Sequence, residues 1–123
     1  MAFSELGVNV MITELDVSVL PFPEKQKGAD VTLNVEWKER YNPYSDVLPD
    51  SMQHKLADRY SELFQLFNKH KDKISRITIW GIHDGQSWRN YWPVRGRTDY
   101  PLLFDREYQP KPAFKAVVEI VND

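Results

Sequence analysis

Two carboxylates, Glu14 and Asp16, are the side chains in this sequence best placed to do chemistry. They close an apolar run over residues 8–12, and Pro21 and Pro23 follow. Such a run predicts a short strand buried on both faces, where acids at the exit are costly unless a site uses them. Residues two apart on a strand point to one face, roughly 6.6 Å apart, and retaining glycosidases use two carboxyl groups about 5–5.5 Å apart. Capping or solvated acids are the alternative interpretation.

Aromatic side chains follow a second predicted strand. Trp80 ends that strand, and Trp88 and Trp92 lie in the loop after it. A flat indole face suits the C–H face of a sugar ring, so tryptophans beside carboxylates indicate sugar binding; the alternative is that Trp80 is core and Trp88 supports the loop. His83 also follows this strand, where lining the site and packing against the loop are both open.

Other chemistries find little support in the sequence. The net charge of −2 gives no basic footprint for nucleic acid, no apolar run reaches the ~20 residues of a membrane helix, and the first seven residues show no signal-peptide pattern. With no cysteine and three scattered histidines, no metal-ligand spacing is present. The sequence has no glycine-rich loop of the kind that binds phosphate. We therefore interpret the charged residues of the second loop as ion pairs that hold the loop in place; they are Arg89, Arg95, Arg97, Asp84, Asp99 and Asp105.

The elements that must position these residues follow from periodicity. Leu56, Tyr60 and Phe64 lie on one face of a helix predicted from Pro49 to about residue 69. The other predicted elements are a cut helix end at 2–7, strands at 9–15 and 74–82, long loops at 18–49 and 83–109, and a helix from Pro112 that buries Ala113, Ala116, Val117 and Ile120. Strand, helix, strand predicts a parallel βαβ unit, although two parallel strands are too few to stand alone. Trp37, Tyr41 and Tyr44 indicate packing or binding within the first loop.

Three motifs carry a resemblance to a known family. TELDV (13–17), IWGIHDGQSW (79–88) and PLLFDREYQPKPAF (101–114) resemble glycoside hydrolase family 10, the endo-1,4-β-xylanases. The resemblance covers nearly all of the chain and is weakest at 22–47. It implies an α/β fold in which residues 1–123 form the C-terminal part of a (β/α)₈ TIM barrel, from the end of helix 6 through strand 7, helix 7 and strand 8 to helix 8.

The resemblance also implies roles for individual residues. Glu14 matches the nucleophile of a retaining enzyme that hydrolyses β-1,4-xylan, and Asp16 matches the acid that supports it. Trp80 and Trp88 match tryptophans that wall the sugar cleft, and Arg89 follows the second as in many members. His83 replaces a smaller polar residue that is common in the family, so the shape of that sugar subsite is expected to differ.

Two family residues have no counterpart in this chain: the acid/base glutamate and the histidine that orients the nucleophile. The isolated chain is therefore expected to be inactive, since general acid catalysis contributes about 10²–10⁴-fold. The partners expected are xylan or xylo-oligosaccharide, and either the missing N-terminal part of the barrel or a second copy. A non-catalytic xylan-binding or fragment-complementation piece is the alternative. No cofactor, metal, nucleic acid or membrane is expected, and the resemblance implies a secreted or periplasmic protein.

Overall fold

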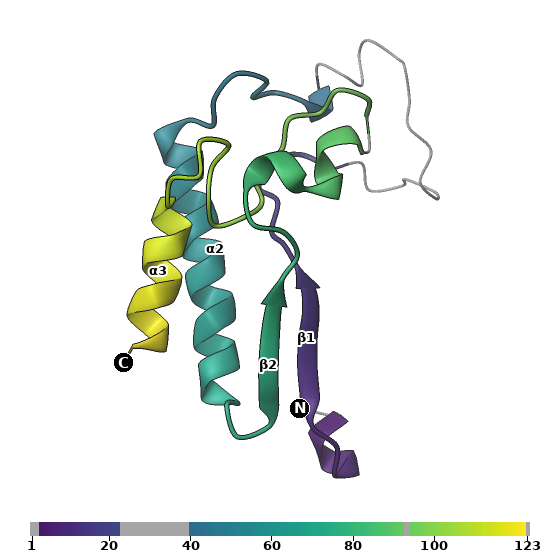
Figure 1. Cartoon of the computed structure of the whole chain (residues 1–123), viewed down its shortest axis with the longest axis vertical. Coiled ribbons are helices and arrows are strands. Elements are labelled where there is room, and N and C mark those ends of the chain that lie inside the picture. Colours follow the sequence, from purple (N-terminus) through teal and green to yellow (C-terminus); the bar gives the residue numbers. More distant parts are fainter. Residues whose placement is uncertain (1–2, 23–39, 93, 123) are drawn as a thin grey trace.

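The computed structural model describes residues 3–22, 40–92 and 94–122 of the 123-residue chain. Two strands and two helices make up its frame (Figure 1). The elements in chain order are the 3₁₀ helix η1 (Phe3–Leu6), strand β1 (Val10–Leu15), helix α2 (Asp50–Lys69), strand β2 (Ile74–Ile79), the 3₁₀ helices η2 (Asp84–Gln86) and η3 (Trp88–Tyr91), and helix α3 (Pro112–Val121).

The two strands run parallel, as the strand–helix–strand order predicts. Val10 pairs with Ile74 and Ile12 with Ile77, and α2 returns the chain from the end of β1 to the start of β2. Both strands therefore end on the same side of the molecule, where the loops after them gather (Figure 1). This common end, made from two segments far apart in sequence, is where parallel α/β folds carry their sites.

Helix α2 forms where the apolar residues recur every three or four positions, and it covers one face of the sheet. The predicted start of this helix is confirmed to within one residue: the prediction placed Pro49 in the first turn, and the helix begins at Asp50. Leu56, Tyr60 and Phe64 are buried on its inner side. Helix α3 begins at Pro112 as expected and packs beside α2.

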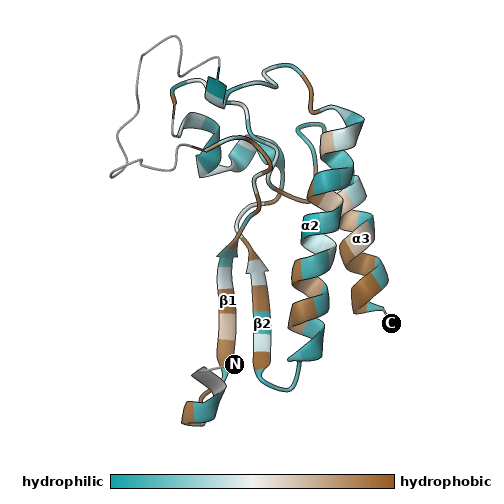
Figure 2. Cartoon of the chain, turned by 180° about the vertical axis from the view of Figure 1, so that it is seen from behind, coloured by the Kyte–Doolittle hydropathy of each residue, from teal (hydrophilic) through white to brown (hydrophobic). Residues whose placement is uncertain are grey.

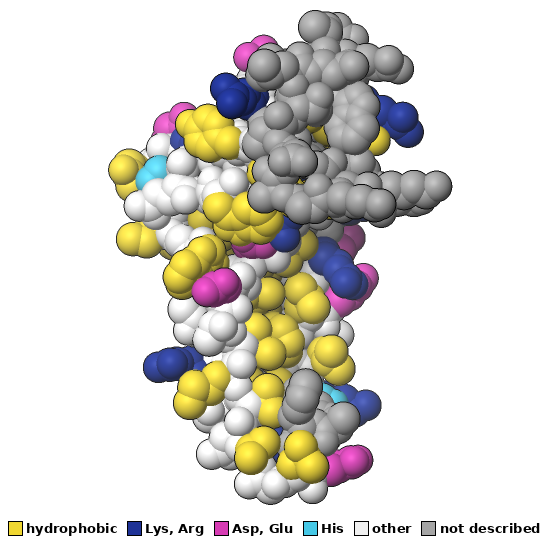
Figure 3. Space-filling view, turned by 90° about the vertical axis from the view of Figure 1, so that its right-hand side faces the viewer, with side chains coloured by type: hydrophobic (Ala, Val, Ile, Leu, Met, Phe, Trp, Pro, Cys, Tyr) yellow, Lys and Arg dark blue, Asp and Glu magenta, His cyan; other side chains and the backbone are white. Residues whose placement is uncertain are grey.

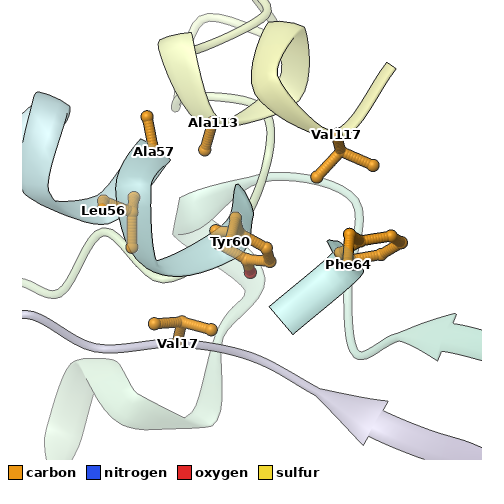
Figure 4. Close-up of a cluster of buried hydrophobic side chains, with 7 residues drawn as sticks. All are labelled: Val17, Leu56, Ala57, Tyr60, Phe64, Ala113 and Val117. Atoms are coloured by element: carbon orange, nitrogen blue, oxygen red, sulfur yellow. The ribbon is translucent and has the colours of Figure 1, made fainter. Parts of the chain in front are cut away.

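The hydrophobic core lies where these two helices meet the segment that leaves β1 (Figure 4). Its buried members are Val17, Leu56, Ala57, Tyr60, Phe64, Ala113 and Val117. The Tyr60 hydroxyl donates a hydrogen bond to the Pro101 carbonyl, so the core also holds the chain segment that returns toward α3. Hydrophobic residues also occur along both strands (Figure 2).

The prediction that β1 is buried on both faces is wrong for this chain. None of its six residues is buried, and Met11 is 54% exposed. Among the described residues the sheet has only the two strands, so β1 has a neighbour on one side. Figure 3 shows the resulting column of hydrophobic side chains along the β1 side of the molecule.

Other expectations differ at the element ends. The expected helix end at 2–7 is a single 3₁₀ turn, and β2 stops at Ile79, three residues earlier than predicted. Within the first loop, Tyr41 is buried and Tyr44 half-buried, whereas Trp37 lies outside the described residues. None of the helices in the described ranges is long and apolar enough to cross a membrane.

Candidate functional site

The ends of the two strands are joined by backbone hydrogen bonding. Leu15 pairs with Ile79, and the Trp80 N–H donates to the Leu15 carbonyl at 2.9 Å. Asp16 and Trp80, each the first residue after its strand, therefore emerge side by side at the same edge of the sheet. The sequence predicted a carboxylate and a tryptophan side by side at this edge, and Asp16 and Trp80 are such a pair.

Glu14 has an unusual backbone conformation. Its φ is +56°, in the left-handed region that costs a non-glycine residue about 1–2 kcal/mol. The pairing register also shifts between Ile12 and Leu15, so the strand bulges at this point. The expectation that Glu14 and Asp16 lie two apart on one regular strand is therefore wrong, since β1 ends at Leu15 and its geometry is irregular at Glu14. The Glu14 side chain is exposed in this chain.

Asp16 links the exit of β1 to the loop after β2. Its Oδ2 accepts a hydrogen bond from Trp88 Nε1 at 2.8 Å, and its Oδ1 pairs with Arg89 Nε at 2.6 Å. The Asp16 side chain is only 4% exposed, which strengthens the ion pair relative to one at the surface. The Arg89 guanidinium also lies 4.8 Å from the Trp88 ring centre. These three residues form one unit, which we call the Asp16 cluster.

The tryptophans form an aromatic surface next to this cluster. The Trp88 and Trp92 ring centres are 5.4 Å apart, and Phe22 lies 4.6 Å from Trp92. Trp80 and Trp88 are each 48% exposed, so neither indole belongs to the core of this chain. Barrel core and sugar wall both stay predictions for Trp80, and about half of each indole is open in this chain.

His83 is held by contacts within its own loop. Its Nδ1 accepts a hydrogen bond from the Gly85 N–H at 3.2 Å, and its ring centre is 4.6 Å from that of Tyr108. A Cβ at residue 85 would lie 2.8 Å from His83 Cε1, so any larger residue there would have to displace the His83 ring. His83 is only half-buried, which leaves part of the ring accessible.

A buried ion pair lies beneath the loop that carries Trp88. Lys111 Nζ is 2.9 Å from Asp84 Oδ2 and donates to the carbonyls of Tyr100 (2.7 Å) and Leu102 (2.8 Å). The Leu102 N–H donates in turn to Asp84 Oδ1. Burial raises the pKa of Asp84 and lowers the pKa of Lys111, and each charge opposes the shift of its partner. Sequence reasoning missed Lys111, because a lysine just before a helix resembles a surface residue.

A second buried ion pair fixes the segment that leaves β1. Arg97 Nη2 is 3.3 Å from Asp99 Oδ2, which also accepts from Ser18 Oγ at 2.7 Å. Arg97 Nη1 donates to the carbonyls of Pro21 (2.9 Å) and Tyr41 (3.1 Å). Arg97 therefore ties three segments together, and burial lowers its pKa.

The expected set of loop-pinning ion pairs is confirmed only in part. Arg97 pairs with Asp99, but Arg89 pairs with Asp16 and Asp84 with Lys111. Asp105 instead closes a turn by accepting from the backbone N–H groups of residues 107 and 109. Within the described ranges, no group of three His, Cys, Asp or Glu side chains is placed to hold a metal ion.

The two parallel strands end side by side, with Asp16 and Trp80 at one edge, which is the place where parallel α/β folds carry their sites. Comparison with known proteins identifies the family. The family description "Glycosyl hydrolase family 10" matches residues 1–120, so the chain belongs to this family of glycosidases. The resemblance that the three motifs carry is thereby confirmed.

Individual relatives are xylanases. The chain is 42% identical over 119 residues to endo-1,4-beta-xylanase A of Xylanibacter ruminicola, covering 97% of this chain and 32% of the relative. A GH10 endoxylanase retrieved from sugarcane soil metagenome superposes with a TM-score of 0.82 at 44% identity, over 97% of this chain and 32% of that one. A mutant structure in complex with xylotriose superposes with a TM-score of 0.72 at 33% identity, over 95% and 31%. The chain thus spans about a third of the length of these relatives.

Proposed function

We propose that this chain carries the nucleophile side of the active site of a retaining endo-1,4-β-xylanase, with Glu14 as the nucleophile. The observation that carries the proposal is the Asp16 cluster, two residues beyond Glu14. Its two hydrogen bonds bind the exit of β1 to the tryptophan-bearing loop after β2. Membership of glycosyl hydrolase family 10 and the xylanase relatives support the same assignment.

The proposed reaction has two displacements. The Glu14 carboxylate attacks the anomeric carbon, the glycosidic C–O bond breaks, and the departing sugar oxygen takes a proton from a second carboxyl group. Water, deprotonated by that second group, then attacks the same carbon and releases Glu14. The second carboxyl group comes from outside residues 1–123.

Asp16 supports the nucleophile in this proposal and does not serve as the second carboxyl group. Its two oxygens are already engaged, one by the Arg89 guanidinium and one by the Trp88 indole N–H. A carboxylate in such a pair acts as a fixed negative charge that orients its neighbours. The register shift between Ile12 and Leu15 and the left-handed φ of Glu14 take the two acids out of the regular strand geometry that would make their side chains parallel.

The substrate proposed is xylan or a xylo-oligosaccharide. Trp80 and Trp88, each about half exposed, offer flat apolar faces to successive sugar rings. Arg89 is held by Asp16 against Trp88, so its remaining donors are available to sugar hydroxyls. The accessible part of His83 is proposed to border the same subsite.

The remainder of the barrel is proposed to come from the rest of a longer protein, or from a second chain. The β1 side carries Met11 at 54% exposure, and beyond β2 Ile82 is 66% exposed. Both positions suit cover by further strands and helices of a closed barrel. Because the chain lacks those strands and the acid/base carboxyl group, we propose that it is inactive by itself. The family resemblance supports a secreted or periplasmic location.

A fusion protein tests the proposal. The C-terminal third of the Xylanibacter ruminicola xylanase is replaced by this chain, and reducing-sugar release from xylan is measured for the fusion and for the isolated chain. We expect activity only in the fusion. Glu14→Ala should lower that activity by at least about 10⁴-fold, whereas Glu119→Ala on the exposed side of α3 should leave it unchanged.

Chemical rescue distinguishes a nucleophile from a residue that merely supports the site. With an activated aryl β-xyloside, azide should restore turnover to the Glu14→Ala fusion and yield the α-glycosyl azide, because azide then takes the place of the carboxylate. A folded Glu14→Ala fusion that retains full activity would refute the proposal. Xylotriose binding that survives Glu14→Ala and disappears in Trp88→Ala, without turnover in any fusion, would instead favour the non-catalytic sugar-binding alternative.

A further inference from the structure

Asn90 is a buried amide whose hydrogen-bonding capacity is fully used. Its Nδ2 donates to the carbonyls of Asp84 (2.8 Å) and Ser87 (3.1 Å). Its Oδ1 accepts from the Asp99 N–H (2.9 Å) and from Arg106 Nη2 (2.7 Å). A side-chain amide offers two donor hydrogens and two acceptor lone pairs, so every one is matched.

The partners of Asn90 belong to two different parts of the chain. Asp84 begins η2, and Ser87 stands between η2 and η3. Asp99 and Arg106 lie in the segment between η3 and α3, which we call the return segment. A 3₁₀ helix of four residues such as η3 has little stability of its own. Asn90 therefore fixes η3 between the turn before it and the segment after it. The two residues of η3 before Asn90 are Trp88 and Arg89, which both bind Asp16.

We propose that Asn90 is a positioning residue that sets the place of Trp88 and Arg89 against Asp16 and thereby controls sugar affinity. The statement on sugar rests on the proposed function, whereas the statement on placement does not. Asn90 does not reach the substrate. It acts through the indole and guanidinium of its two neighbours.

The chemistry of the amide makes the proposal specific. In Asn90→Asp the volume is unchanged and the acceptors for Asp99 and Arg106 remain. The two donor hydrogens are lost, however, and a carboxylate oxygen then faces the carbonyls of Asp84 and Ser87. Repulsion at these two contacts displaces η3, so Asn90→Asp should disturb the Asp16 cluster although it conserves shape.

The test is the NMR signal of the Trp88 indole N–H in the full chain. The signal is assigned by its disappearance in Trp88→Phe, and Asp16→Ala gives its position and hydrogen-exchange rate when the hydrogen bond is absent. In Asn90→Ala and Asn90→Asp we expect the signal to move toward the Asp16→Ala position and its exchange to quicken about tenfold.

Asn42→Ala is the matched control. Asn42 is also an amide with hydrogen bonds to the return segment, donating to the Gly96 carbonyl (3.2 Å) and accepting from the Thr98 N–H (2.8 Å), but it does not bond to η2 or η3. Its removal should lower the urea midpoint and leave the Trp88 signal in place. An unchanged Trp88 signal in folded Asn90 variants, or an equal shift in Asn42→Ala, overturns the proposal. Unfolding of both Asn90 variants also overturns it, because Asn90 would then serve the fold at large.

A second measurement separates this proposal from the proposed function. In the fusion protein, xylohexaose binding is titrated with Glu14→Ala present to prevent turnover, and Asn90→Asp should weaken the affinity at least tenfold. A fusion that does not bind xylohexaose even with Asn90 intact counts against the proposed function. The indole signal still decides the positioning role, because that readout needs no sugar.

Discussion

Replacing Lys111 by methionine should remove much of the stability of this chain. Lys111 Nζ has three partners, the Asp84 carboxylate at 2.9 Å and the carbonyls of Tyr100 and Leu102 at 2.7 and 2.8 Å. The Asp84 and Lys111 side chains are 0% and 2% exposed, so water cannot replace the lost ammonium. Removing one partner of a buried ion pair costs about 3–5 kcal/mol. Domains of this size are stable by about 5–15 kcal/mol.

Urea unfolding followed by circular dichroism measures the loss. With a slope of about 2 kcal/mol per molar urea, a cost of about 4 kcal/mol lowers the midpoint by about 2 M. Lys115→Met, which removes an exposed lysine from α3, the helix that follows Lys111, is the control and should change stability by no more than about 0.5 kcal/mol.

The double variant Asp84→Asn/Lys111→Met tests whether the cost comes from the orphaned charge. With no buried carboxylate left, its loss of stability should be smaller than the sum of the two single losses, by about 1–3 kcal/mol. Single losses that add to within about 0.5 kcal/mol would refute the argument, since Lys111 would then not act through Asp84.

The stability of Lys111→Met should also depend on pH in a predictable direction. Burial already raises the pKa of Asp84, and Lys111→Met removes the charge that most opposes this shift. A carboxyl group with a raised folded pKa contributes stability at low pH and loses it as the pH rises through that pKa. The deficit of Lys111→Met relative to the unchanged chain should therefore shrink as the pH falls from about 7 toward about 4.

Three further predictions concern single side chains. Because the φ of Glu14 is +56°, Glu14→Gly should be more stable than Glu14→Ala by about 1 kcal/mol in urea unfolding, and the opposite order would contradict a left-handed backbone there. Burial raises the pKa of Tyr60, so the free energy of unfolding should fall above about pH 10 by up to about 1.4 kcal/mol per pH unit. Tyr60→Phe should remove the contribution of Tyr60 to this pH dependence. An unchanged pH dependence in Tyr60→Phe would argue against a raised pKa of Tyr60. Arg97→Lys should cost about 3 kcal/mol, because one ammonium cannot reach the carbonyls of Pro21 and Tyr41 together with Asp99, whereas Arg95→Lys, at an exposed position, should cost almost nothing.

The frame of the fold could be predicted because it depends on local periodicity. The apolar positions of α2 recur at helical spacing, and Pro112 marks the start of α3. The two strands and their parallel pairing follow from short apolar runs separated by a helix. The burial of β1 could not be predicted correctly, since it depends on neighbours that these 123 residues do not supply.

The site was harder to predict, because its details depend on contacts distant in sequence. Glutamate gives no signal for a left-handed backbone, so the bulge at Glu14 was not foreseen. Asp84 was expected to pair with an arginine of its own loop, and its partner is Lys111, 27 residues away. Asn90 carries no sequence signal of its own, because an asparagine in a polar loop resembles a surface residue.

The Arg97 network has a consequence for the order of folding. Ser18 and Asp99 are 81 residues apart in sequence, and Arg97 is 76 residues from the Pro21 carbonyl that it binds. Contacts of such long range carry a high entropic cost of loop closure, and so does the pairing of Val10 with Ile74, which joins β1 to β2. Helix α2, whose hydrogen bonds are local, should therefore form first, and the paired strands and the edge that bears Glu14 and the tryptophans should take shape together and later.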